Sequence, residues 1–255
     1  MNIPNFLLAG EVAIVTGGRR GIGKTIALTF AEAGANVVVC DLVVEDGELQ
    51  AVAEEIQRLG RRSLAIQADT SKKKDVDNLV QKVVSQFGTI DILVNNAGIM
   101  IKSPFLDMPE DDWDKLMSVD LKAYYLCSQA VGRRMVEQKK GKMINIASQY
   151  AFKVTPGMGV YSIAKAGVVM LTRVLAQELG RYGIRANAIA PCLVKTEFSR
   201  DSWSDPEFIK QCESSIPLGR VAETTDLAGA ALFLASEASC YITGHTIVVD
   251  GGTLA

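Results

Sequence analysis

Short runs of apolar, mostly β-branched residues alternate along the chain with segments that have a helical pattern. The segments carry an apolar residue every three or four positions, as in Ile26, Phe30 and Ala33. Such alternation predicts a parallel sheet with helices on both faces. We therefore predict an α/β fold of the doubly wound Rossmann type with a seven-stranded sheet. The predicted strands cover residues 12–15, 36–40, 64–66, 90–94, 143–147, 184–189 and 246–249.

The length and composition are those of one globular domain. A chain of 255 residues can bury a large core, and 48% of its residues are hydrophobic while 22% are charged. The formal net charge of -2 gives no reason to expect a nucleic acid or a membrane surface as a partner. Residues 1–10 lack a basic leader, and no stretch approaches the ~18 apolar residues of a membrane span. We expect residues 1–255 to form a single, soluble, cytoplasmic domain.

Cysteine and histidine give no sign of a disulfide framework or a metal site. The five cysteines are scattered and have no Cys-x-x-Cys spacing, so buried or free thiols are expected. His245 is the only histidine, which excludes a histidine-rich metal cluster and leaves a Ser-His-Asp triad possible only through this residue. We predict no bound metal and no catalytic role for His245.

A glycine-rich turn follows the first predicted strand. Positions 16–23 read Thr-Gly-Gly-Arg-Arg-Gly-Ile-Gly, and a helical pattern follows at 24–33. A strand, a glycine-rich turn and a helix amino terminus together form a cradle for pyrophosphate, because glycines let the backbone approach and the first helical amides are free to donate. The residues expected to contact a dinucleotide here are Gly17, Arg20, Gly21, Ile22 and Gly23.

A carboxylate at the end of the second predicted strand indicates which nicotinamide cofactor is accepted. Asp41 follows Gly23 by eighteen residues, close to the ~20 expected for an acid that binds the adenosine ribose. It can accept hydrogen bonds from both ribose hydroxyls and would repel a 2′-phosphate, which favours NAD. Arg20 favours NADP, because a guanidinium near the ribose could pair with that phosphate. We predict NAD, with NADP as the alternative.

Tyr161 and Lys165 lie four residues apart, a spacing that makes side chains neighbours on one face of a helix. An isolated phenol has a pKa near ~10, and a fixed cation beside it stabilises the phenolate and lowers that value. Tyr161 could then accept or donate a proton. Ser148 follows the buried strand 143–147, so its hydroxyl is expected at a strand's carboxyl end, where open α/β sheets bind ligands. A Tyr-x-x-x-Lys pair alone is equally typical of a surface helix.

In combination, these motifs resemble the single-domain branch of the short-chain dehydrogenase/reductase family along essentially the whole chain. The resemblance rests on the glycine-rich turn and on Ser148, Tyr161 and Lys165. Their order and spacing, together with several further motifs, make the match highly specific. The further matching positions are Asp69 after the third strand, Asn-Asn-Ala-Gly at 95–98 after the fourth, Asn187, Pro191 and Thr196 around the end of the sixth, and Thr243-Gly244 near the chain's end.

The resemblance implies the catalytic roles. Tyr161 would be the general acid and base, Lys165 its activator and a contact for the nicotinamide ribose, and Ser148 the polariser of the substrate carbonyl. In alcohol oxidation the phenolate would take the hydroxyl proton while hydride leaves the carbon for the nicotinamide.

The resemblance also implies further cofactor contacts and an assembly. Asp69 would hold the adenine, Asn95 would line the cofactor cleft and Thr196 would contact the carboxamide. The alternative for Asp69 and Asn95 is that they close turns at strand ends, and for Thr196 that it is a loop residue. The family's quaternary structure implies a homotetramer.

Two positions depart from the family pattern. The family usually has a catalytic asparagine in the helix after the Asn-Asn-Ala-Gly turn, and the aligned residue here is Asp120. The family residue acts partly through its backbone carbonyl, which an aspartate keeps, so we expect activity to survive. A carboxylate near Lys165 would stabilise the ammonium and dampen its effect on Tyr161. Cys192 stands where glycine is common and is expected to be a small packed residue that borders the substrate.

Two regions are expected to shape the substrate pocket. Residues 193–217 form a long polar excursion that is a candidate substrate lid or an ordinary surface insertion. The side chains expected in the pocket mix apolar and polar character without a clear charge signature for a carboxylate. They are Met100, Ile101, Gln149, Tyr150 and Phe152, in addition to Cys192.

We predict an oxidoreductase that transfers hydride between a nicotinamide cofactor and a secondary alcohol or ketone. Overall similarity favours a sugar acid, a polyol or another small hydroxy compound, and an NADPH-dependent 3-oxoacyl thioester reductase is the alternative. Enoyl reductases resemble the chain less, because their tyrosine-to-lysine spacing is wider. A nucleotide-binding regulator with vestigial catalytic residues is the alternative from another class; Asp120 favours it, whereas the intact Ser148, Tyr161 and Lys165 argue against it.

Overall fold

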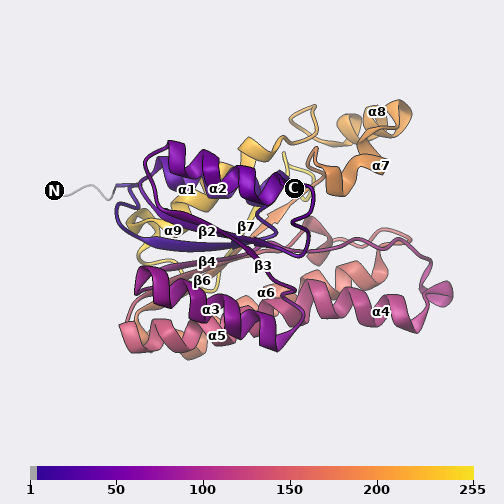
Figure 1. Ribbon diagram of the computed structural model, residues 1–255. Helices are drawn as coiled ribbons and strands as arrows, with labels where there is room; N and C mark the ends of the chain where they lie inside the picture. Colours follow the sequence, from indigo (N-terminus) through magenta and orange to yellow (C-terminus); the bar gives the residue numbers. More distant parts are fainter. Residues whose placement is uncertain (1–4) are drawn as a thin grey trace.

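The computed structural model describes residues 5–255 as one parallel sheet between two layers of helices (Figure 1). The strand order is β3-β2-β1-β4-β5-β6-β7, and every neighbouring pair is parallel. This confirms the predicted single-domain fold of the doubly wound Rossmann type. Residues 1–4, part of the segment expected to carry no leader, lie outside the described residues.

The strands begin and end within two residues of the predicted runs. Ile90, expected in the fourth strand, precedes it because its N–H donates to Gln138 Oε1 instead of to a neighbouring strand. The seven strands are β1 (Val12–Thr16), β2 (Asn36–Asp41), β3 (Ser63–Gln67), β4 (Ile92–Asn95), β5 (Gly141–Ile146), β6 (Ile184–Pro191) and β7 (Thr246–Val249).

Alternate residues of the central strands face the two helical layers. In β1, Ala13 and Val15 pack into the core under α1 (Gly21–Glu32), α2 (Glu48–Arg58) and α9 (Ala228–Ala235). Val12 and Ile14 face the opposite core, under α3 (Lys73–Phe87), α5 (Ala123–Gln138) and α6 (Gly159–Leu179). Figure 1 shows these two sets of helices on opposite faces of the sheet. Burial on both faces explains why each strand is a nearly continuous apolar run.

The strand order reverses next to β1. The chain runs from β1 outward through β2 and β3, then returns to place β4 on the other side of β1. Because all strands are parallel, their carboxyl ends meet along one edge of the sheet, and a ligand crevice opens where the order reverses. The glycine-rich turn after β1 and the turn at residues 95–98 after β4 therefore lie beside each other.

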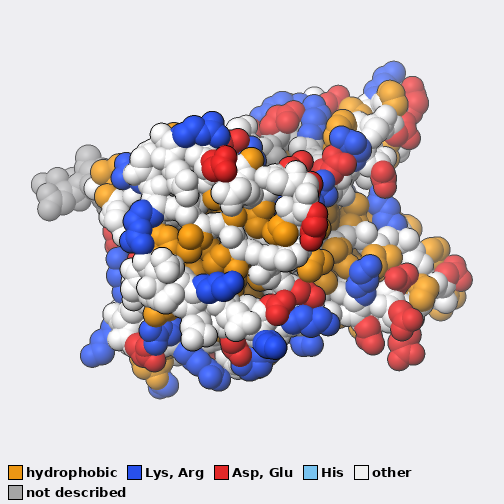
Figure 2. Space-filling view, in the orientation of Figure 1, with side chains coloured by type: hydrophobic (Ala, Val, Ile, Leu, Met, Phe, Trp, Pro, Cys, Tyr) orange, Lys and Arg blue, Asp and Glu red, His pale blue; other side chains and the backbone are white. Residues whose placement is uncertain are grey.

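Two helical segments extend beyond that edge. One is α4 (Glu110–Met117); the other is residues 193–217, which contain α7 (Arg200–Trp203) and α8 (Pro206–Ser215). Figure 2 shows a notch in the surface between these two segments. Helix α8 has strong start signals, because Asp205 accepts hydrogen bonds from the N–H groups of Glu207 and Phe208, and proline occupies the first helical position.

Helix α6 and its extension, Gly159–Tyr182, are long and apolar enough to cross a membrane by length and composition. It holds no uninterrupted run of ~18 apolar residues, because Lys165, Arg173 and Glu178 lie within it, so the expectation that the chain has no such run stands. The helix nevertheless packs along β6 and α5 within the domain, and Val168, Thr172 and Ala176 are buried there. A core helix that is covered on one face by the sheet passes the same length and hydropathy criteria.

The packing beneath α1 predicts that Phe30 contributes more to the stability of the fold than the exposed Phe105. Replacing Phe30, which is fully buried in the core, by alanine should lower the free energy of unfolding by about 3 kcal/mol or more. The matched change Phe105→Ala removes a ring that is 67% exposed and should cost no more than about 0.5 kcal/mol. Urea unfolding of both variants measures the difference, and equal losses would contradict this account of the core.

Candidate active site

Ser148, Tyr161 and Lys165 come together at the carboxyl edge of the sheet. Ser148 lies two residues after the end of β5, while Tyr161 and Lys165 lie one turn apart near the start of α6. All three side chains are buried, Ser148 Oγ accepts a hydrogen bond from the N–H of Tyr150, and the Ser148 side chain lies close enough to lower the pKa of Tyr161. Tyr161 and Lys165, predicted to share a helical face, therefore form one cluster with Ser148, which was predicted at a strand end.

The ammonium of Lys165 is surrounded by oxygen atoms from three other segments. Its Nζ lies 3.1 Å from Asp120 Oδ2, 3.3 Å from Tyr124 Oη and 3.2 Å from the carbonyl oxygen of Ile146. It also lies 5.5 Å from the centre of the Tyr161 ring. A buried cation with these neighbours is held in one position.

The electrostatics around Tyr161 differ from the expectation of a lowered pKa. Burial raises the pKa of Tyr161 to about 12, and the Asp120 carboxylate adds to that rise. The Lys165 ammonium and the hydrogen bond with Ser148 act in the opposite direction, as predicted, but burial outweighs them in the protein alone. For Lys165, burial favours the neutral amine, yet the nearby Asp120 raises the pKa above its ordinary value.

Asp120 lies where the sequence analysis expected an added carboxylate, beside Lys165. It belongs to a π-helical turn, Ser118–Lys122, between α4 and α5. The N–H of Ile99 donates to Asp120 Oδ1 over 2.8 Å, and burial raises the pKa of the carboxyl against the opposing effect of Lys165. Single π-helical turns inside helices often mark functional sites. Here the turn carries a fully buried acid to the ammonium.

The glycine-rich turn leaves room for a bound phosphate group only because it lacks side chains. Gly17 and Gly21 have φ values of +63° and +56°, which favour glycine. A Cβ on Gly23 would lie 2.1 Å from the carbonyl oxygen of Gly17. Thr196 packs against the same turn, because a Cβ on Gly21 would lie 3.3 Å from its methyl group. The turn after β1 and the segment after β6 thus enclose one cradle, which fits a dinucleotide pyrophosphate.

Asn95, one of the predicted cofactor residues, takes part in the hydrogen bonding of the fold. Its side chain is buried, and its Nδ2 donates to Ser128 Oγ and Asn145 Oδ1. The next residue, Asn96, supports the cradle, because its Nδ2 donates to the carbonyl oxygens of Thr16 and Gly17.

Asp69 and Asp41 lie at the ends of neighbouring strands β3 and β2. Asp69 closes its own turn by accepting hydrogen bonds from the N–H and hydroxyl of Ser71 on Oδ1. Asp41 Oδ1 accepts from the N–H of Val43. The sequence analysis missed Arg19, which lies beside Asp41, whereas Arg20 is exposed at the start of α1. Two adjacent arginines in a turn carry no sequence signal that tells which one faces the ribose position.

Aromatic and apolar side chains surround Tyr161. The Tyr150 ring meets Tyr161 edge-on at 6.2 Å between centroids, and Phe198, from residues 193–217, lies 6.5 Å from it. Met100 and Ile101 pack in the same cluster. Phe152 is exposed.

Cys192 lies just beyond β6 and packs against the core beneath α9. Burial raises the pKa of its thiol, and Asp250 adds to the rise. The thiol is therefore neutral at physiological pH, which agrees with the packed role expected for this residue.

Other candidate regions lie apart from this cluster. His245 is exposed just before β7 begins, at the amino edge of the sheet, so it cannot form a triad with Ser148.

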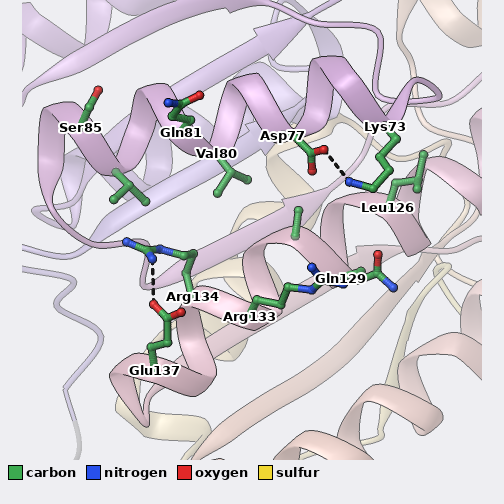
Figure 3. Close-up of a pocket in the computed structure, with 12 residues that line it drawn as sticks. Lys73, Asp77, Val80, Gln81, Ser85, Leu126, Gln129, Arg133, Arg134 and Glu137 are labelled. Atoms are coloured by element: carbon green, nitrogen blue, oxygen red, sulfur yellow. Dashed lines mark hydrogen bonds and ion pairs between the residues drawn. The ribbon is translucent and has the colours of Figure 1, made fainter.

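Figure 3 shows a groove of about 490 Å³ between α3 and α5. Its lining includes the ion pairs of Lys73 with Asp77 and of Arg134 with Glu137, but none of the predicted site residues. Within residues 5–255, no group of three or more His, Cys, Asp or Glu side chains is arranged to hold a metal ion.

Comparison with known proteins agrees with this geometry. A family model described as enoyl-(acyl carrier protein) reductase matches residues 17–253. The chain is 42% identical to a 3-oxoacyl-[acyl-carrier-protein] reductase of Staphylococcus epidermidis over 94% of this chain and 97% of that one. It is 39% identical to a 2-dehydro-3-deoxy-D-gluconate 5-dehydrogenase of Dickeya dadantii over the full length of both.

A solved structure shows the same likeness. The gluconate 5-dehydrogenase of Burkholderia cenocepacia, in complex with NADP and tartrate, superimposes with a TM-score of 0.94 at 36% identity, and the match covers 99% of this chain and 98% of that one. The chain therefore belongs to the short-chain dehydrogenase/reductase family. It is an NAD(P)-dependent oxidoreductase that acts on a hydroxyl or keto group.

Gly23 lies too close to the Gly17 carbonyl oxygen to carry a side chain, so a substitution at Gly23 should weaken cofactor binding. The change Gly23→Ala forces the turn to shift, at a cost of about 1–3 kcal/mol, and should weaken NADH binding by about tenfold or more. Gly229→Ala, in α9 with open space around it, is the matched control and should leave the affinity unchanged. Fluorescence titration of NADH measures both, and an unchanged affinity in the first variant would contradict the cradle.

The ion pair of Asp120 with Lys165 predicts a shift in pH dependence. We expect alcohol oxidation to need the Tyr161 phenolate, and the Asp120 charge raises the pKa of that phenol. Asp120→Asn should move the acid limb of the rate to lower pH by about one unit. The matched change Asp114→Asn, at an exposed position within α4, should not move it. A rate profile that stays in place, or moves to higher pH, would show that the carboxylate does not act on Tyr161.

Proposed function

We propose that the protein is an NAD-dependent dehydrogenase of a sugar acid, a polyol or another small polyhydroxy compound. The observation that carries this proposal is Gln149 Oε1, which is buried next to Ser148 and accepts no hydrogen bond from any residue in the described range 5–255. A buried amide oxygen without a donor is costly unless a ligand supplies one. A second hydroxyl group of the substrate would supply that donor, whereas the methylene groups of an acyl chain would not.

The side chains divide the reaction between them. Tyr161 Oη takes the proton of the substrate hydroxyl, and Ser148 Oγ hydrogen-bonds the substrate oxygen. The Lys165 ammonium, behind the ring, stabilises the negative charge that forms on the phenolate. NAD supplies the hydride acceptor when it is bound. In reduction the same groups act in reverse, and Tyr161 donates its proton to the carbonyl oxygen.

The residues around the cradle would hold the cofactor. Gly17, Arg20, Gly21, Ile22 and Gly23 form the turn that receives the pyrophosphate. At the adenosine end, the Asp41 carboxylate suits the ribose hydroxyls of NAD, and Asp69 would face the adenine. At the nicotinamide end, Lys165 would reach the ribose and Thr196 the carboxamide. The Burkholderia relative was crystallised with NADP, so the choice of NAD rests on Asp41 in this chain.

Residues 193–217 would act as a substrate lid. Phe198 lies against Tyr161, and Lys102 Nζ, after β4, lies 3.0 Å from Ser202 Oγ in α7. The first contact joins residues 193–217 to α6, and the second joins them to the segment after β4. Opening them would admit the substrate, and closing them would exclude water from the phenol. With the lid closed, Gln149, Tyr150 and Cys192 would border the substrate.

Reduction of a 3-oxoacyl thioester is the second candidate. The relative from Staphylococcus epidermidis carries that name at 42% identity, and the exposed Arg20 would suit NADPH. Enoyl reduction, named in the family model's description, suits the chain less because only three residues separate Tyr161 from Lys165. A regulatory protein that only binds nucleotide is disfavoured by the assembled Ser148, Tyr161 and Lys165.

We also propose a cytoplasmic homotetramer. The five cysteines, all within the described residues, are free thiols, as expected in a reducing compartment. The outer face of α6 exposes Ile163, Met170 and Val174, which are large apolar side chains that a second copy of the chain could cover. Size-exclusion chromatography with light scattering would report the mass of the assembly.

A substrate screen tests the proposed function. Sugar acids, polyols, secondary alcohols and hydroxyacyl thioesters are offered with NAD⁺ and NADP⁺ in parallel, and NADH or NADPH absorbance is followed. We expect turnover of a polyhydroxy compound with NAD⁺ that the Tyr161→Phe variant lacks. Gln149→Leu should lower kcat/KM for that compound by about tenfold and leave any thioester activity unchanged.

The screen separates the candidates. Faster turnover of a hydroxyacyl thioester with NADP⁺, unaffected by Gln149→Leu, would replace the first candidate with the second. Activity that persists in Tyr161→Phe would contradict the assignment of the acid and base for either substrate.

A further inference from the structure

One arginine and three carboxylates form a charged cluster at the carboxyl ends of β1 and β2. The Arg19 side chain is only 10% exposed. Its Nη1 binds Asp46 and lies 3.1 Å from Glu48 Oε2, while its Nε lies 3.7 Å from Asp41 Oδ1. One positive and three negative formal charges give this cluster a net charge of about -2 at neutral pH.

The two outer carboxylates are held in place by the start of α2. Asp46 Oδ1 accepts a hydrogen bond from the N–H of Glu48, which is the first residue of that helix. A carboxylate at a helix amino terminus is favourably placed relative to the helix dipole. The helix start therefore places both acids next to Arg19 Nη1, while Asp41 lies beside Nε.

Arg19 keeps one donor unused on the side of Asp41. Its Nε is buried and, among the described residues, has no hydrogen-bond partner. A buried guanidinium N–H without an acceptor indicates that a ligand completes the arrangement. A ribose hydroxyl oxygen, held by the Asp41 carboxylate, is an acceptor of the required kind.

A 2′-phosphate would meet a different environment. It carries about two negative charges and would enter a cluster that already has an excess of carboxylates. The guanidinium that could pair with it is engaged by Asp46 and Glu48. Arg20 is exposed at the start of α1 and makes no ion pair with the acids of this cluster.

We propose that Asp46 and Glu48 set the cofactor preference by holding Arg19, which withholds its guanidinium from the 2′-phosphate of NADP. Removing both carboxylates frees Arg19 to bind that phosphate and raises the affinity for NADPH relative to NADH. This inference rests on the proposed preference for NAD, and it adds that the preference comes from the partners of Arg19 as well as from Asp41.

Binding constants test the proposal without any substrate. The dissociation constants of NADH and NADPH are measured by fluorescence titration for the wild-type protein, for Asp46→Asn/Glu48→Gln and for the same pair combined with Arg19→Ala. We expect the wild type to bind NADH more tightly. The double variant should shift the NADPH to NADH affinity ratio toward NADPH by about tenfold or more, and Arg19→Ala should abolish that gain.

Two controls distinguish the release of Arg19 from a general loss of negative charge near the cofactor. Glu54→Gln removes a carboxylate from the exposed face of the same helix, where it contacts Gln50, and should leave the ratio unchanged. A gain that persists without Arg19 would assign the effect to lost negative charge alone and overturn the proposal. An unchanged ratio in the double variant, or a wild type that prefers NADPH, would also overturn it. Failure of the sugar-acid assignment would leave these binding constants untouched.

Discussion

A buried ammonium group organises the catalytic end of this molecule. Lys165 Nζ is taken out of water and can be tolerated there only because Asp120, Tyr124 and the Ile146 carbonyl oxygen surround it. These partners come from the π-helical turn, from α5 and from the end of β5, so the ammonium fixes three elements relative to α6. Tyr161 lies one turn before Lys165 on that helix, and its phenol is positioned by the same packing.

The balance of carboxylates and cations differs between the two ends of the proposed cofactor site. At the nicotinamide end one carboxylate meets one cation, so the Asp120 and Lys165 charges nearly balance and the phenol of Tyr161 sits in a neutral, buried setting. At the adenosine end three carboxylates meet the single cation of Arg19, and the excess is negative. The proposed preference for NAD rests on that negative excess, and the pKa of Tyr161 responds to each nearby charge at the other end.

Much of this arrangement could be predicted from the sequence, and the exceptions have physical causes. The strands were predictable because burial on both faces requires continuous apolar runs, and Tyr161 and Lys165 because a spacing of four defines a helical face. Asn95 and Asn96 could not be separated, since neighbouring residues at a strand end point to opposite sides. The high pKa of Tyr161 was missed because Tyr150 and Phe198, which bury it, come from distant segments that only the fold brings together.

The rate of hydride transfer in a single turnover, compared between the wild-type protein and Lys165→Met across pH 6–10, tests the central claim most directly. If the ammonium makes Tyr161 a base, the variant should be slower by about 100-fold, and both rates should rise with pH because the pKa of Tyr161, about 12, lies above this range. Equal rates in the two proteins, or rates that do not change with pH, would contradict the claim that Lys165 acts through the charge state of Tyr161.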